Sequence, residues 1–66
     1  MKVIDKKTIA LWKKPHAILP KIDYTMNTKY YRVIDKGETL GASVDPLEAL
    51  KLMVGNKEAE LQEVLL

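Results

Sequence analysis

The segment DPLEALKLMVGN, residues 45–56, constrains the fold more than any other part of the sequence, because it carries the signals for both ends of a helix. Asp45 is a favourable N-cap, and Pro46 suits the first helical position, where its missing N–H has no helical partner. The apolar residues that follow recur at i, i+3 and i+7, the spacing of one helix face: Leu47, Leu50 and Val54. Gly55 favours the left-handed conformation that ends many helices. The sequence therefore predicts a helix over residues 45–54 with one apolar stripe.

The residues just before this helix have the pattern of a β-hairpin. Residues 30–34 (YYRVI) are rich in strand formers, and a second run alternates as a half-buried strand does: Leu40, Ala42 and Val44. Between the two runs, Gly37 can adopt the positive φ that a tight turn needs. Gly41 inside the second run indicates a bulge or a close approach of another part of the chain.

The letters VIDK of this hairpin occur a second time, close to the N-terminus. A second hairpin would place Ile9 and Leu11 on one face of a strand. Alternatively, Asp5 caps a helix of one or two turns that ends before Pro15, since the residue before a proline avoids helical dihedrals. We favour the strand, and the choice between strand and short helix for residues 5–14 stays open at this point.

At the other end of the chain, KEAELQEVLL predicts a short tail helix over residues 57–66, with Asn56 as its cap. The expected fold is α+β: a small antiparallel sheet of two hairpins, or of three to four short strands, within residues 2–44, followed by one or two C-terminal helices packed on one face. We expect a single small domain over residues 1–66, since a chain of this length has room for one core. Its predicted core is Ile9, Leu11, Val33, Leu40, Val44, Leu47, Leu50, Val54 and Leu61.

No combination of residues predicts catalysis, and we expect a protein that is not an enzyme and uses neither cofactor nor metal. The chain has no cysteine and a single histidine, which removes thiolate chemistry and leaves little for a transition metal. The glycines are isolated and do not form a phosphate-binding loop. No apolar run has the length of a signal peptide core or of a membrane span, so we expect a cytoplasmic protein without a membrane partner.

Charge is distributed unevenly along the chain. Residues 1–36 hold eight Lys and one Arg against three Asp, a balance of +6, whereas residues 37–66 hold two Lys against one Asp and five Glu, a balance of −4. A basic half is attracted to phosphate or to an acidic protein surface. Basic and aromatic residues interleave at the positions that we consider for nucleic-acid binding: Lys13, Lys14, Lys29, Tyr30 and Arg32.

The apolar C-terminus suggests another kind of contact. Four residues there are the candidates for a protein interface: Leu61, Val64, Leu65 and Leu66. We therefore expect a small regulatory or inhibitory module that docks on a larger host protein, with DNA or RNA binding as the alternative and a homodimer as a further option. The order of hairpin, Asp-Pro cap and helix is similar to small α+β modules such as phage-encoded inhibitors and the DNA-binding domains of some integrases, in architecture alone.

Overall fold

The structure, a computed structural model, describes residues 2–22, 24, 28–56 and 58–66. Within these residues the element order is β1 (Lys2–Ile4), α1 (Lys6–Trp12), β2 (Lys29–Asp35), β3 (Glu38–Ser43), α2 (Pro46–Leu52) and β4 (Glu60–Leu65). The strands form one four-stranded sheet in the order β1-β4-β2-β3, and every neighbouring pair is antiparallel. The predicted α+β class is confirmed. The predicted order is only partly right, because a helix follows the first strand and a strand follows the second helix.

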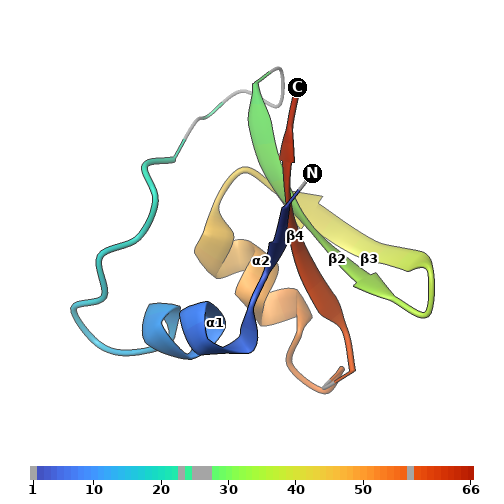
Figure 1. The fold of residues 1–66 in the computed structure, drawn as a ribbon, viewed down its shortest axis with the longest axis horizontal. Coiled ribbons are helices and arrows are strands. Elements are labelled where there is room, and N and C mark those ends of the chain that lie inside the picture. Colours follow the sequence, from blue (N-terminus) through green and yellow to red (C-terminus); the bar gives the residue numbers. More distant parts are fainter. Residues whose placement is uncertain (1, 23, 25–27, 57) are drawn as a thin grey trace.

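This topology places both helices on one side of the sheet. Strands β1 and β2 run parallel to each other with β4 between them, and α1 connects them. Strands β3 and β4 also run parallel to each other, with β2 between them, and α2 connects them. Each half is therefore a split β-α-β unit. Figure 1 shows α1 and α2 side by side on the same face, with the opposite face of the sheet uncovered by helices.

The core lies between the sheet and the two helices. Its buried members are Ile4, Ile9, Trp12, Tyr31, Val33, Ala49, Leu50, Ala59 and Leu61. Four residues of the predicted core belong to it: Ile9, Val33, Leu50 and Leu61. Four others are exposed, contrary to the prediction: Leu11, Leu40, Leu47 and Val54. Val44 is half-buried. The prediction for Leu47 and Val54 failed because α2 packs through a different face, on which Pro46, Ala49 and Leu50 are buried.

The preferred strand at residues 5–14 is wrong, and the alternative helix is correct. Asp5 is the N-cap of α1, and its side-chain Oδ1 accepts a hydrogen bond of 2.7 Å from the backbone N–H of Thr8. Hydrogen bonds from Thr8 lower the pKa of the Asp5 carboxyl, with a further contribution from the charge of Lys7. The local capping signal thus outweighs the similarity to the VIDK of the hairpin.

The predicted tail helix at residues 57–66 is also wrong, with residue 57 outside the described part of the chain. Residues Glu60–Leu65 form β4, which lies between β1 and β2 and pairs with both. Leu61 is fully buried there, opposite Val33 on one side and Ile4 on the other. Pairing on both edges and burial of Leu61 override the helix propensity of this segment, because an isolated helix of about ten residues is marginal in water.

The hairpin of β2 and β3 is confirmed, including its special glycines. Lys36 and Gly37 both have positive φ, at 52° and 81°, as a two-residue primed turn requires. Further along, Leu40 has no partner because Val33 pairs with Gly41 and Ile34 with Thr39, which makes a β-bulge.

Gly41 also meets the expectation of a close approach. A Cβ added at this position would lie 2.6 Å from Cδ1 of Leu52, so the missing side chain allows α2 to pack onto β3. Helix α2 has the predicted N-cap, since Asp45 accepts a hydrogen bond of 2.9 Å from the backbone N–H of Leu47. The predicted end is wrong: the helix ends at Leu52 with Met53 as its C-cap, and Gly55, with a φ of 84°, lies in the turn that follows.

Candidate docking groove

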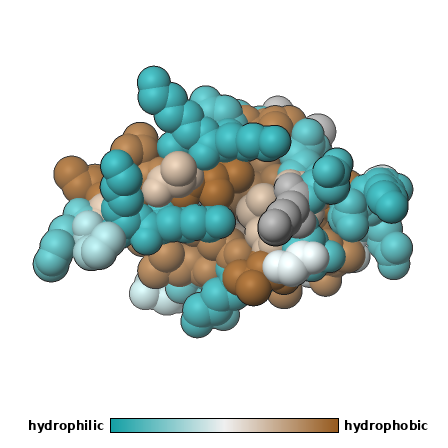
Figure 2. Space-filling model, turned by 90° about the horizontal axis from the view of Figure 1, so that it is seen from below, coloured by the Kyte–Doolittle hydropathy of each residue, from teal (hydrophilic) through white to brown (hydrophobic). Residues whose placement is uncertain are grey.

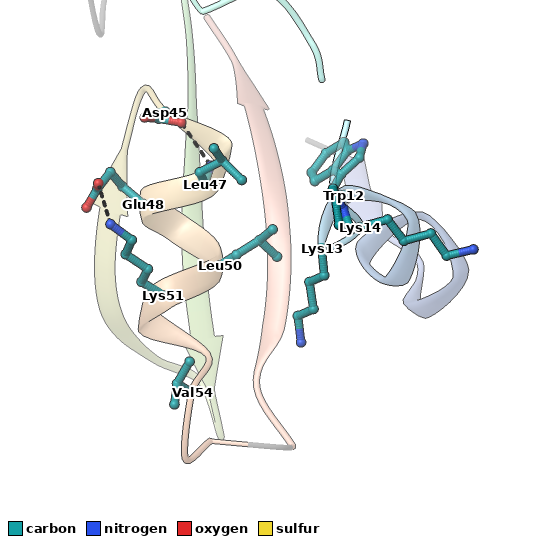
Figure 3. Close-up of a pocket in the computed structure, with 10 residues that line it drawn as sticks. Trp12, Lys13, Lys14, Asp45, Leu47, Glu48, Leu50, Lys51 and Val54 are labelled. Atoms are coloured by element: carbon teal, nitrogen blue, oxygen red, sulfur yellow. Dashed lines mark hydrogen bonds and ion pairs between the residues drawn. The ribbon is translucent and has the colours of Figure 1, made fainter. Parts of the chain in front are cut away.

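A groove separates α1 from α2 on the helical side of the molecule. Its volume is about 680 Å³, and Figure 3 shows the two helices on its two sides with β4 behind it. We call it the interhelical groove, and its lining consists of Trp12, Lys13, Lys14, Pro15, Asp45, Leu47, Glu48, Leu50, Lys51 and Val54. It brings together the C-terminal end of α1 and the length of α2.

The floor of the interhelical groove is apolar and rigidly held. Leu50 and Trp12 are buried and belong to the core. The Trp12 ring lies edge-on to Tyr31, with 6.1 Å between ring centroids and 87° between planes. Tyr31 in turn donates a hydrogen bond of 3.0 Å to Glu63 Oε2, and burial together with this carboxylate raises the pKa of the Tyr31 hydroxyl. The floor therefore rests on the central strands of the sheet.

Two apolar residues of α2 remain exposed at the ends of the interhelical groove. Leu47, in the first turn of α2, is 42% exposed. Val54, two residues beyond the end of α2, is 79% exposed. Together with buried Leu50 they are the stripe that the sequence predicts to be covered. In Figure 3, Leu47 and Leu50 both extend from the α2 side towards the groove. The buried face of α2 consists of Pro46, Ala49 and Leu50, so the stripe shares only Leu50 with it and its other two residues face solvent.

The two sides of the interhelical groove differ in charge. On the α1 side, Lys13 and Lys14 are exposed. On the α2 side, Glu48 and Lys51 form an ion pair of 3.1 Å, and the Asp45 carboxylate that caps the helix gives this side a net negative charge. In Figure 3 this pair lies on the side of α2 that is turned away from Trp12. The groove thus has an apolar floor, a basic α1 side and an α2 side on which Asp45 adds a carboxylate to the paired Glu48 and Lys51.

The sequence-predicted nucleic-acid residues lie on two different faces. Lys13 and Lys14 line the interhelical groove. Lys29 shares the helix-facing side of the sheet with Tyr31, and its Nζ lies 5.9 Å from the Tyr31 ring centroid. Strand alternation turns the remaining two candidates, Tyr30 and Arg32, towards the opposite face. The structure therefore does not assemble the five residues into one surface.

On that opposite face the polar groups contact one another. Arg32 Nε donates to Gln62 Oε1 at 2.7 Å, and Gln62 Nε2 donates to Glu60 Oε2 at 2.6 Å. Gln62 is buried beneath its neighbours. Arg32 is therefore engaged within the sheet, and the acidic Glu60 beside it reduces the attraction of this face for phosphate.

The four C-terminal interface candidates are also separated. Leu61 is buried in the core, Val64 is half-buried on the open face of the sheet, and the last two residues, Leu65 and Leu66, are exposed. The tail is fixed by pairing, since the Leu66 N–H donates to the Thr28 carbonyl at 2.8 Å.

Trp12 and the combination of Leu47 with Val54 are not among the site residues predicted from the sequence. Trp12 stands next to two lysines, and a helix rather than a strand at this point would have placed it on the buried face. Over residues 2–22, 24, 28–56 and 58–66, no group of three His, Cys, Asp or Glu side chains is arranged to hold a metal ion. Neither helix in this part of the chain is long and apolar enough to cross a bilayer. A comparison with known protein families, with curated proteins and with solved structures finds no match.

Proposed function

We propose that this chain is a small, non-catalytic binding protein, regulatory or inhibitory, that docks on a larger protein through the interhelical groove. The observation that carries the proposal is the incomplete covering of the α2 stripe: Leu50 is buried, whereas Leu47 and Val54 face solvent on either side of it. An apolar helix stripe is stabilised when it is covered, and the helix-in-groove mode is a common way for a partner to cover it.

The rigidity of the floor supports the same function. Trp12 and Leu50 are held by the core, so a partner would meet a preformed surface and lose little free energy in ordering it. The contacts that dominate interface energy lie at the centre of an interface, and the residues around them exclude water, the arrangement that Leu50 with Leu47 and Val54 would give.

DNA or RNA binding remains the second candidate, and it has less support. Its five residues lie on two faces of the sheet, and one of them, Arg32, already contacts Gln62. The favourable feature is the pair Lys13 and Lys14, which stays exposed beside the groove. Titration of labelled duplex and single strands at low salt tests this candidate: retention that falls with a log–log salt slope of about −0.7 to −0.9 per phosphate contact would support it.

A comparative pull-down from a lysate of the native source tests the docking function. The immobilised proteins are the wild type, Leu47→Asp and Leu40→Asp, because Leu47 and Leu40 are 42% and 38% exposed and only Leu47 lines the groove. We expect a protein that the wild type and Leu40→Asp retain and that Leu47→Asp loses. Circular dichroism confirms that all three are folded. Equal retention by both variants, or no retained protein, contradicts the proposal.

A further inference from the structure

We infer that the partner segment that fills the interhelical groove is an acidic amphipathic helix, with its apolar residues on the α2 stripe and its carboxylates towards the lysines of α1. This inference rests on the proposed docking function and adds the chemistry of the partner. Three observations carry it: the spacing of the exposed apolar residues, the nature of the floor, and the charge of α1.

The spacing matches a helical occupant. Leu47 lies in the first turn of α2 and Val54 lies two residues beyond its end, so the two residues flank a helix of 7 residues, about 10.5 Å long. A partner helix that lies along the groove presents apolar residues at i, i+3 or i+4, and i+7 over the same length. Helices flank the groove on both sides, so the new helix would complete a helical layer over the sheet (Figure 1).

The floor favours aliphatic side chains over nucleic-acid bases. Base stacking needs an accessible aromatic face, and the one aromatic residue that lines the groove, Trp12, is buried against Tyr31. Leu47 and Val54 supply branched aliphatic side chains to the accessible part of the lining. Leucine, isoleucine or methionine of a partner would pack against them.

The positive charge of α1 favours a partner helix that carries acidic residues on the flank facing α1. Lysines stand at both ends of the helix: Lys6 and Lys7 in its first turn, and Lys13 and Lys14 at its C-terminal end. The first turn contains no acidic residue, although the helix dipole disfavours cations there. None of these four lysines forms an ion pair with a carboxylate among the described residues.

Lys6 and Lys13 also border a smaller depression of about 330 Å³, formed with Ile9, Ala10 and Met53. Lys13 is common to this depression and to the interhelical groove. Figure 2, the view from below, shows extended hydrophilic side chains over brown apolar surface at this end of the molecule. Apolar surface crossed by unpaired cations suits a helix that brings carboxylates with its apolar stripe.

Three synthetic helical peptides test the inference by fluorescence anisotropy against the full chain. Each peptide is designed with about 14 residues, roughly four helical turns. The first has a leucine stripe, glutamates along one flank and glutamines elsewhere. The second replaces each glutamate by lysine. The third has the composition of the first with the stripe scrambled. We expect the first peptide to bind at least about tenfold more tightly than either of the others, and increasing salt to reduce that preference.

Variants separate this inference from the proposed function. The double change Lys13→Glu and Lys14→Glu should remove the preference for the first peptide, whereas Leu47→Asp should weaken both striped peptides. Equal binding of the glutamate and lysine peptides, or no binding of the first peptide, overturns the inference. A further outcome of the pull-down is that the lysine double variant still retains the same protein as the wild type while Leu47→Asp loses it. In that case the docking function stands and the acidic partner is wrong. Concentration-dependent dimerisation lost in Leu47→Asp would assign the groove to a second copy and overturn the inference.

Discussion

Trp12 of α1 and Tyr31 of β2 meet edge to face, with their ring centroids 6.1 Å apart. This contact joins an early helix to a central strand across the long connection between them, which carries Pro15 and Pro20. It also supports the floor of the interhelical groove, because Trp12 lines the groove on one side and packs on Tyr31 with the other. One residue therefore links the stability of the fold to the shape of the candidate site.

Replacing Trp12 by alanine should lower the free energy of unfolding by about 3–5 kcal/mol, the range for loss of a large buried aromatic side chain. Such a loss is a large share of the stability of a domain of this size. Trp12→Phe keeps an aromatic edge near Tyr31, so it should lose less than half as much free energy of unfolding as Trp12→Ala. Urea unfolding followed by far-UV circular dichroism measures both. A Trp12→Ala protein as stable as the wild type would show that α1 does not pack as described.

Gly41→Ala should be destabilising by about 1 kcal/mol, the low end for an overpacked site, because the new methyl group would meet Leu52 Cδ1 at 2.6 Å and this side-chain end can shift. The strain depends on that one side chain, so the double variant with Leu52→Ala should lose less stability than the sum of the two single changes. A double-mutant cycle from denaturant unfolding gives the coupling. Strict additivity would mean that β3 and α2 are not in contact at this point.

Tyr31 should make the fold sensitive to alkali. Its folded-state pKa lies above the ordinary value of 10.0, so the folded protein keeps the proton at pH values where the unfolded chain releases it. Stability from this group is complete below about pH 10 and falls as the pH rises above it. We expect the free energy of unfolding of the wild type to fall relative to that of Tyr31→Phe from about pH 9 to about pH 11. Lysine titration affects both proteins alike and cancels in this comparison. A difference that is constant with pH would contradict this assignment.

Asp5 should have the opposite dependence, at acid pH. Its folded-state pKa is lowered by Thr8, so its contribution is present above the unfolded value near 3.8 and is lost as the pH falls through the folded value. Asp5→Ala should therefore melt below the wild type at neutral pH and approach it at about pH 2–3. Asp5→Asn, which caps without titrating, should keep its advantage over Asp5→Ala at acid pH. Thermal melts over this pH range decide the point, and parallel curves for wild type and Asp5→Ala would exclude the cap.

The sequence was sufficient for features that are encoded locally. Asp45 caps α2 and Gly37 forms the hairpin turn, as predicted from their own positions. Gly55 has the expected positive φ, but α2 ends at Leu52, before it. The segment Glu60–Leu65 could not be assigned in this way, because its strand conformation depends on pairing with β1 and β2, which lie far away in the chain. For α1, two local signals competed, and the Asp5 cap could be recognised as decisive only from the folded protein.

The candidate site was predictable only in parts. The Leu47, Leu50 and Val54 stripe is visible in the sequence, but its spacing does not reveal how much of it the sheet covers. Exposure of its ends follows from the sheet order and from the place of α1, which are properties of the whole fold. The charge of Lys13 and Lys14 was likewise visible, whereas their place beside an apolar groove was not.

The most direct test of the docking function is the affinity of the purified partner for two matched variants. Leu47→Asp and Leu40→Asp introduce the same charge at leucines with 42% and 38% exposure, one in the interhelical groove and one at the bulge of β3. Isothermal titration should give a Kd at least about tenfold weaker for Leu47→Asp, a loss of about 1.4 kcal/mol or more, and a Kd within about twofold of the wild type for Leu40→Asp. Equal affinities for the two variants, or a larger loss with Leu40→Asp, would show that the interhelical groove is not the docking surface.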